Sequence, residues 1–150
     1  MSLQEEITNG WKDAMRAGDS LRKDTLSGLR AAIKNAEIDS RAGVGSLDDE
    51  GVLKVIEREA KKRRDSIEEF QKVGRTERVE AEQNELAVLQ EFLPAPLSEA
   101  ELELLTREAI AQSGATSAKE MGNVMKVLVP KLQGRADGKS ASAAVKRLLG

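Results

Sequence analysis

The stretch Leu93-Pro94-Ala95-Pro96-Leu97-Ser98 interrupts a sequence that is otherwise rich in helix-forming residues. Proline has no backbone N–H donor and disfavours a helical conformation in the residue before it, so a helix must end close to Leu93. The string Ser98-Glu99-Ala100-Glu101 follows directly and has the form of a capping box, which predicts the start of a new helix. The sequence therefore predicts two helical subdomains, residues 1–93 and 97–150, joined by a proline-containing linker.

The composition predicts an all-α fold. Charged residues make up 33% of the chain and aromatic residues only 2%. Alanine, leucine, glutamate, lysine and arginine dominate, whereas the β-branched and aromatic residues that favour strands are few. We expect a multihelical protein with about four helices before the linker and about three after it.

Apolar residues at helical spacing mark the first two helices. Gly18 is expected to end the first helix, and Asp19 or Ser20 to cap the second. The break after the second helix is predicted as a loop over residues 39–46. The apolar stripe of the first helix is predicted to contain Leu3, Ile7, Trp11 and Met15.

The third helix is predicted to be long, from a cap at Ser46 to Gly74, and Thr76 is expected to cap the fourth. Arg63 projects toward the apolar side of the third helix, four residues after Glu59. This spacing predicts a partly buried ion pair between those two residues. The other cations of this segment alternate with acids, which predicts a web of exposed ion pairs rather than a nucleic-acid site. They are Arg58, Lys61, Lys62 and Arg64.

In the second subdomain the fifth helix is expected to run from the Ser98 cap to Gly114. Residues 117–120, Ser-Ala-Lys-Glu, resemble a second capping box and predict the start of the sixth helix. A turn over residues 133–138 precedes a short seventh helix, with Asp137 as a candidate cap. The string Gly134-Arg135-Ala136-Asp137-Gly138-Lys139-Ser140 resembles a phosphate-binding loop, but it is one residue short and follows a helix instead of a strand. We interpret it as a basic turn between helices.

The residue types argue against several kinds of chemistry. The chain has no histidine and no cysteine, which removes zinc sites of the usual kind, Cys-His and Ser-His catalysis, and disulfides. No carboxylate occupies an apolar setting that would predict a raised pKa. We therefore expect no catalytic residues, no metal and no cofactor. The acidic first residues and the lack of an apolar run of about 20 residues predict a cytoplasmic protein without membrane contact.

Charge is unevenly distributed along the chain. Residues 1–93 carry 16 Lys and Arg against 20 Asp and Glu, a net charge of −4, whereas residues 115–150 carry seven cations against two acids, a net charge of +5. The positive segment is a candidate surface for nucleic-acid backbones, and the alternative is the solvated face of ordinary amphipathic helices. The candidate nucleic-acid-binding residues are Lys119, Lys126, Arg135, Lys139, Lys146 and Arg147.

Four strings together resemble the YqeY family of small, wholly helical bacterial proteins. They are Leu29-Arg30, Lys34-Asn35-Ala36-Glu37-Ile38-Asp39, Arg63-Arg64-Asp65-Ser66-Ile67-Glu68-Glu69-Phe70 and the proline-containing linker. Two further strings, Met121-Gly122-Asn123-Val124-Met125 and Gly134-Arg135-Ala136-Asp137-Gly138, are also similar to the tail of GatB, the B subunit of the aspartyl/glutamyl-tRNA amidotransferase.

The resemblance implies an accessory role. The GatB tail is a helical module attached to a separate catalytic part, and it approaches tRNA rather than performing chemistry. We therefore expect a non-catalytic protein that binds tRNA or associates with an amidotransferase or aminoacyl-tRNA synthetase. Glutamine-dependent carbon–nitrogen ligase activity, with glutamine as amido-N-donor, belongs to these relatives by family association only. A protein-interaction adaptor without nucleic-acid binding and a true ligase are the competing hypotheses.

Overall fold

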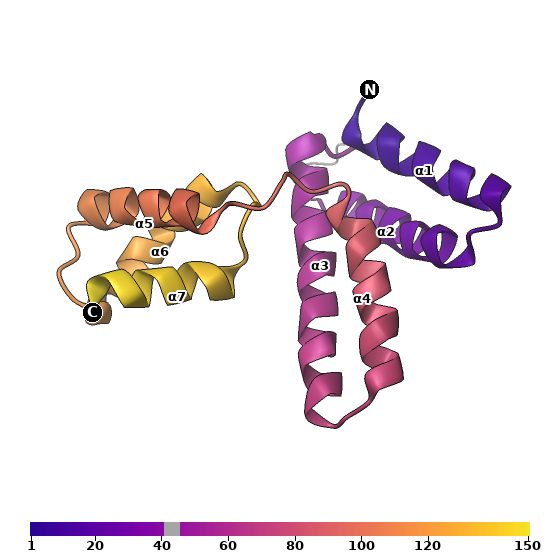
Figure 1. Ribbon diagram of the computed structural model, residues 1–150. Coiled ribbons are helices and arrows are strands. Elements are labelled where there is room, and N and C mark those ends of the chain that lie inside the picture. Colours follow the sequence, from indigo (N-terminus) through magenta and orange to yellow (C-terminus); the bar gives the residue numbers. More distant parts are fainter. Residues whose placement is uncertain (41–45) are drawn as a thin grey trace. The chain divides into compact units, whose positions relative to one another are not determined.

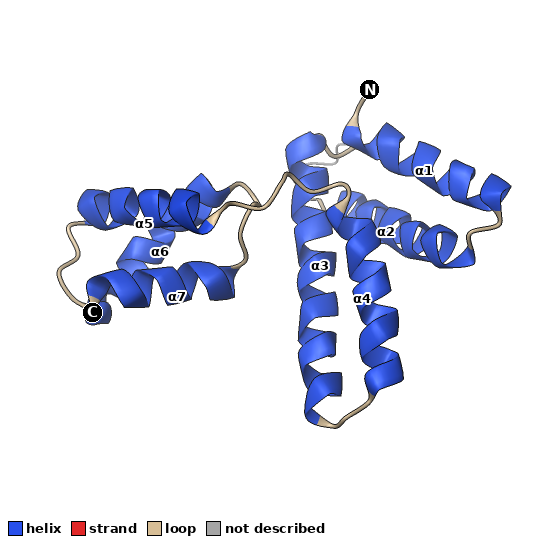
Figure 2. Cartoon of the chain, viewed as in Figure 1, coloured by secondary structure: helices blue, strands red, loops and turns tan. Residues whose placement is uncertain are grey.

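The computed structural model describes residues 1–40 and 46–150, and within them every regular element is a helix (Figure 2). The predicted all-α fold is confirmed. Contacts divide the chain into two compact units, Met1–Leu93 and Pro94–Gly150. The elements in chain order are α1 Leu3–Ala17, α2 Ser20–Asp39, α3 Asp49–Lys72, α4 Thr76–Gln90, α5 Glu99–Ser113, the 3-10 turn η1 Ala118–Glu120, α6 Met121–Leu132 and α7 Gly138–Leu149.

In the first unit, α1 packs along α2, and α3 forms a long hairpin with α4 (Figure 1). The hydrophobic core lies where α2 meets the first half of α3 and the end of α4. Its buried apolar side chains come from all four helices, which explains why these four segments fold as one body. The largest are Ile7, Leu26, Leu29, Ile33, Val52, Ile56 and Leu89.

Helix α1 ends at Gly18 as expected, with a backbone φ of 70° that glycine adopts without strain. Its predicted apolar stripe is wrong at one position, because Met15 is 44% exposed and Ala14 is buried in its place. Each four-residue step advances the side chain by about 40° around the helix, so three steps from Leu3 turn it well away from the core. Asp19 is the residue that caps α2, by accepting a hydrogen bond from the backbone N–H of Arg22 at 3.1 Å.

Two of the predicted caps in the first unit are wrong. Helix α3 is capped by Asp48, which accepts from the N–H of Gly51 at 2.8 Å, and not by Ser46. Thr76 is the first residue of helix α4 and not its cap. The cap position is Arg75, whose side chain makes no capping hydrogen bond. The expected loop over residues 39–46 is only partly observable, because Asp39 belongs to α2 and residues 41–45, with Gly43 and Gly45, lie outside the described part.

In the second unit, α5 has the predicted capping box: Ser98 and Glu101 exchange hydrogen bonds of 3.1 Å, and Gly114 ends the helix at a φ of 73°. The second predicted capping box is wrong. Ser117 makes no capping hydrogen bond, and the Glu120 carboxylate accepts instead from the N–H of Thr116 at 2.7 Å. The core of this unit is small and contains Ala109, Val124, Leu128, Leu132, Ala141 and Val145.

Candidate nucleic-acid interface

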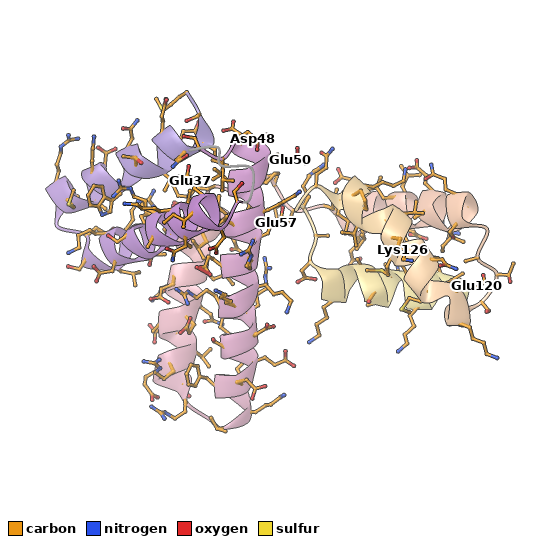
Figure 3. All side chains as sticks on the ribbon, turned by 180° about the vertical axis from the view of Figure 1, so that it is seen from behind. Glu37, Asp48, Glu50, Glu57, Glu120 and Lys126 are labelled. Carbon is orange, nitrogen blue, oxygen red and sulfur yellow. The ribbon has the colours of Figure 1, made fainter. Side chains whose placement is uncertain are left out.

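Lys126 lies on the outer face of α6. Val124 and Leu128 are fully buried on either side of it in the sequence. A residue midway between them is turned by about 200° from each, so its side chain points away from the core. Lys126 is accordingly exposed (Figure 3).

Helix α7 repeats this arrangement. Ala141 and Val145 form its buried face, whereas Lys139 and Lys146 are exposed. Seven residues correspond to almost two full turns, which places both lysines on the same outer face. Arg147 is the next residue after Lys146, turned by about 100° from it, and is also exposed.

The charge of Arg147 acts on α5. The pKa of Glu103 is lowered, mainly by a hydrogen bond from Arg107 and to a smaller extent by the positive charges of Arg107 and Arg147. Arg147 is thus partly compensated by an acid of its own unit. Its contribution to an anion-binding surface should be smaller than that of Lys126 or Lys146.

Arg135 is positioned differently from the other candidates. Its Nε donates to the backbone carbonyl of Ala95 at 2.8 Å, and its Nη2 lies 3.5 Å from the Glu101 carboxylate. Its own carbonyl accepts from the N–H of Leu97 at 2.8 Å. Arg135 therefore fastens the start of the second unit to the turn between α6 and α7, a role that sequence reasoning missed because the contact spans 40 residues.

Lys119 lies in η1 and is exposed. Among the described residues, no carboxylate lies within 4.0 Å of the ammonium groups of Lys119, Lys126 or Lys146. Lys131 is partly screened, since its Nζ lies 4.0 Å from Glu108. Three of the predicted lysines are thus exposed without an ion pair to any described residue, and Lys139 on α7 is exposed as well.

The turn over residues 134–140 does not have the structure of a phosphate-binding loop. Helix α6 precedes it, and a carboxylate already occupies the start of α7: Asp137 accepts from the N–H of Ser140 at 2.7 Å. Asp137, the candidate cap in the sequence, therefore does cap α7. A second anion at these amides would compete with that carboxylate.

The predicted pairing of α3 cations with acids is observed for two of the four residues concerned, whereas Arg58 and Arg64 have no carboxylate within 4.0 Å among the described residues. Lys61 lies 3.0 Å from Asp65, and Lys62 lies 3.2 Å from Glu59, with both lysines on exposed surface. The predicted partner of Arg63 is wrong, because that residue reaches across the hairpin to two acids of α4. Its Nε lies 3.2 Å from Glu85 and 3.6 Å from Glu82.

Two carboxyl groups contradict the expectation that no acid has a raised pKa. Burial raises the pKa of Glu57, partly offset by the charge of Lys54. Burial also raises the pKa of Glu85, where Arg63 opposes the shift and Glu82 reinforces it.

Within residues 1–40 and 46–150, no three acids are grouped as metal ligands would be. Of the described helices, none combines the length and apolar character that crossing a bilayer requires.

The sequence profile of the YqeY family, described as Yqey-like protein, matches residues 4–149. The chain belongs to the YqeY family. It is similar to proteins named altered inheritance of mitochondria protein 41, mitochondrial. That of Lachancea thermotolerans is 40% identical over 95 residues, 61% of this chain and 50% of the relative, and that of Kluyveromyces lactis is 42% identical over 84 residues, 56% and 44% respectively. That of Pyrenophora tritici-repentis is 30% identical over 145 residues, 93% of this chain and 76% of the relative.

The YqeY-family chain spans about half the length of the first two of these relatives. Their names place them in mitochondria and state no reaction and no ligand. The comparisons therefore show the family and leave the activity and the ligands open to proposal.

Proposed function

We propose that this YqeY-family protein is a non-catalytic accessory protein that binds tRNA through its second unit. The observation that carries the proposal is the set of exposed lysines on η1, α6 and α7 that have no carboxylate within ion-pair distance among the described residues, namely Lys119, Lys126 and Lys146. The lysines of α3, by contrast, all lie within 4.0 Å of an acid three or four residues away.

The residues available here suit contact with sugar and phosphate rather than with bases. Lysine ammonium groups act as flexible point charges, which bind phosphate without reading sequence. The second unit contains no aromatic residue, because Trp11, Phe70 and Phe92 all belong to the first. Stacking of aromatic rings on bases, a common source of selectivity for single-stranded RNA, therefore cannot contribute. Recognition should depend on the shape of the RNA and on salt.

The resemblance of the second unit to the GatB tail supports tRNA as the nucleic acid and an amidotransferase or aminoacyl-tRNA synthetase as the protein partner. In this proposal a partner enzyme performs the carbon–nitrogen ligation, and the isolated chain turns over neither glutamine nor ATP. The cytoplasmic address remains a prediction, since fungal relatives carry the word mitochondrial in their names.

The test is a titration against total tRNA at several salt concentrations, using a Lys119→Gln, Lys126→Gln, Lys146→Gln triple variant. Each phosphate group that the variant no longer neutralises should lower the slope of log affinity against log salt by about 0.9 or less. The matched control replaces Lys61, Lys62 and Arg64 by Gln, which removes the same charge from α3, where two of these residues are already paired.

Equal weakening in the two variants would contradict the assignment to the second unit. No measurable affinity at about 50 mM salt would refute tRNA binding, since nonspecific contacts are strong at low salt. A partner protein that stays bound after nuclease treatment would then favour the adaptor hypothesis.

A further inference from the structure

An open cleft with a mixed polar and apolar lining lies in the first unit, between the first half of α1 and the second half of α2. Its volume is about 440 Å³. The two helices are antiparallel neighbours joined at Gly18 (Figure 1), so the start of α1 lies beside the end of α2. The side chains that give the cleft its chemistry are Gln4, Thr8, Ser27, Arg30, Lys34 and Glu37.

Arg30 is held in place by the only tryptophan of the chain. Its guanidinium carbon lies 4.1 Å from the centre of the Trp11 ring, within the range of a cation–π contact. The Trp11 Nε1 donates to the Ser27 hydroxyl at 2.8 Å, which fixes the ring and leaves the hydroxyl proton of Ser27 available as a donor. The arginine is therefore presented on a rigid support, with its outer N–H groups not used by that contact.

Lys34 follows Arg30 by four residues and lines the same cleft. Two like charges at this spacing on one helix repel each other. Among the described residues neither has a carboxylate within 4.0 Å, whereas Arg22 and Lys23, on the same helix, are both paired with acids. The repulsion between Arg30 and Lys34 is thus not compensated by an ion pair within the part of the chain that the structure describes.

Glu37 is the only acid among the described residues that line the cleft, and its carboxylate is engaged in a hydrogen bond with the backbone. One of its carboxylate oxygens accepts from the backbone N–H of Leu47 at 3.1 Å, which ties the end of α2 to the segment before α3. Figure 3 shows Glu37 at this end of the unit, near Asp48 and Glu50. The cleft therefore combines two cations and several neutral donors with a single acid that is engaged at its edge.

We propose that this cleft binds a small molecule through a phosphate monoester group. Such a group carries a charge between about −1.5 and −2 at neutral pH, which matches Arg30 and Lys34 together. Its oxygens accept several hydrogen bonds, for which the guanidinium fork, the ammonium group and the hydroxyls of Thr8 and Ser27 are suitable donors. An anion between the two cations removes their mutual repulsion. The site is separate from the proposed tRNA surface, which belongs to the other unit.

The fluorescence of Trp11 provides the assay, because it is the only tryptophan and lies against Arg30. The probes are inorganic phosphate and a nucleoside 5′-monophosphate, titrated to about 10 mM at constant ionic strength. Both should produce a saturable change, and the same nucleoside without phosphate should produce none. Phosphorus NMR line broadening gives a second readout that does not depend on the tryptophan.

The decisive variant is Lys34→Gln, which leaves the Trp11–Arg30 contact in place. It should weaken phosphate binding about tenfold, the lower part of the range for a hydrogen bond to a charged group. Lys54→Gln is the matched control, since Lys54 is an exposed lysine of α3 outside the cleft. Equal weakening by both variants, binding of the unphosphorylated nucleoside, or no binding by either readout would overturn the proposal.

Discussion

Replacing Arg63 by methionine should destabilise the first unit by about 2 kcal/mol. The substitution keeps most of the apolar stem of the side chain but removes the cation that pairs with Glu82 and Glu85. These side chains are 13% and 30% exposed, so two carboxylates would be left largely buried without their ion-pair partner. Removing one partner of a fully buried pair costs about 3–5 kcal/mol. Exposed pairs contribute about 0–1 kcal/mol, and this cluster lies between the two limits.

The second half of this prediction concerns Glu85→Gln, which should stabilise the protein slightly at pH 7. Burial raises the pKa of Glu85. The folded state therefore binds this proton more readily than the unfolded state, and its contribution to stability falls as pH rises through the interval between the two pKa values. Glutamine removes the buried charge, so the pH dependence above the ordinary carboxyl range should become flatter.

The geometry explains why the ion pairs with Arg63 do not fully offset the cost of burying the carboxylates of α4. Although Arg63 and Glu82 lie within ion-pair distance, neither the Arg63 Nε nor the Glu82 Oε2 has an aligned hydrogen bond among the described residues. Urea denaturation followed by Trp11 fluorescence reports on the first unit, and Arg58→Met on the exposed face of α3 is the matched control. A destabilisation by Arg63→Met no larger than that of the control, or an equal destabilisation by Glu85→Gln, would refute the reasoning.

Three other predictions concern the second unit. Leu128→Ala should cost about 2–5 kcal/mol, because Leu128 is fully buried in a small core; circular dichroism should show an early transition that Trp11 fluorescence does not follow. Ser98→Ala should cost about 1 kcal/mol by removing the α5 cap, measured as a lower melting temperature than for the exposed control Ser140→Ala. Arg135→Gln should lower the salt slope of tRNA binding less than Lys126→Gln, since Arg135 is engaged with Ala95; a larger effect would show that the arginine contacts RNA directly.

The helices could be predicted from the sequence because their signals are local. Ser98 and Glu101 form a cap within one turn, and Gly18 and Gly114 end helices through the conformation of a single residue. The wrong predictions of helix caps at Ser46 and Ser117 also have a local cause. Several residues near each of these positions could cap a helix, and the sequence pattern does not decide which serine or acid reaches the free N–H groups.

The contacts that the sequence did not predict join distant parts of the chain. Arg63 has an acid four residues before it, yet its charge is met by Glu82 and Glu85 from the other arm of the α3–α4 hairpin. Helical periodicity places Arg63 on the packed face but does not specify which acids α4 brings there. The same limitation applies to Arg135 and to the raised pKa of Glu85, both of which depend on packing between elements.

Net charge and aromatic residues differ between the two units, and the difference bears on which unit an RNA can approach. The first unit has a net charge of −4 and holds all three aromatic side chains, whereas the lysine-rich part of the second has a net charge of +5 and none. At physiological salt the field of a charge is screened within about 8 Å, so a polyanion approaching either unit responds mainly to that unit's own surface. The first unit should therefore repel an RNA backbone even though its cleft admits a single phosphate, because two cations in one cleft suffice for a small anion. A long backbone needs several exposed cations that are not already paired, and among the described residues Lys119, Lys126 and Lys146 on η1, α6 and α7 meet that condition.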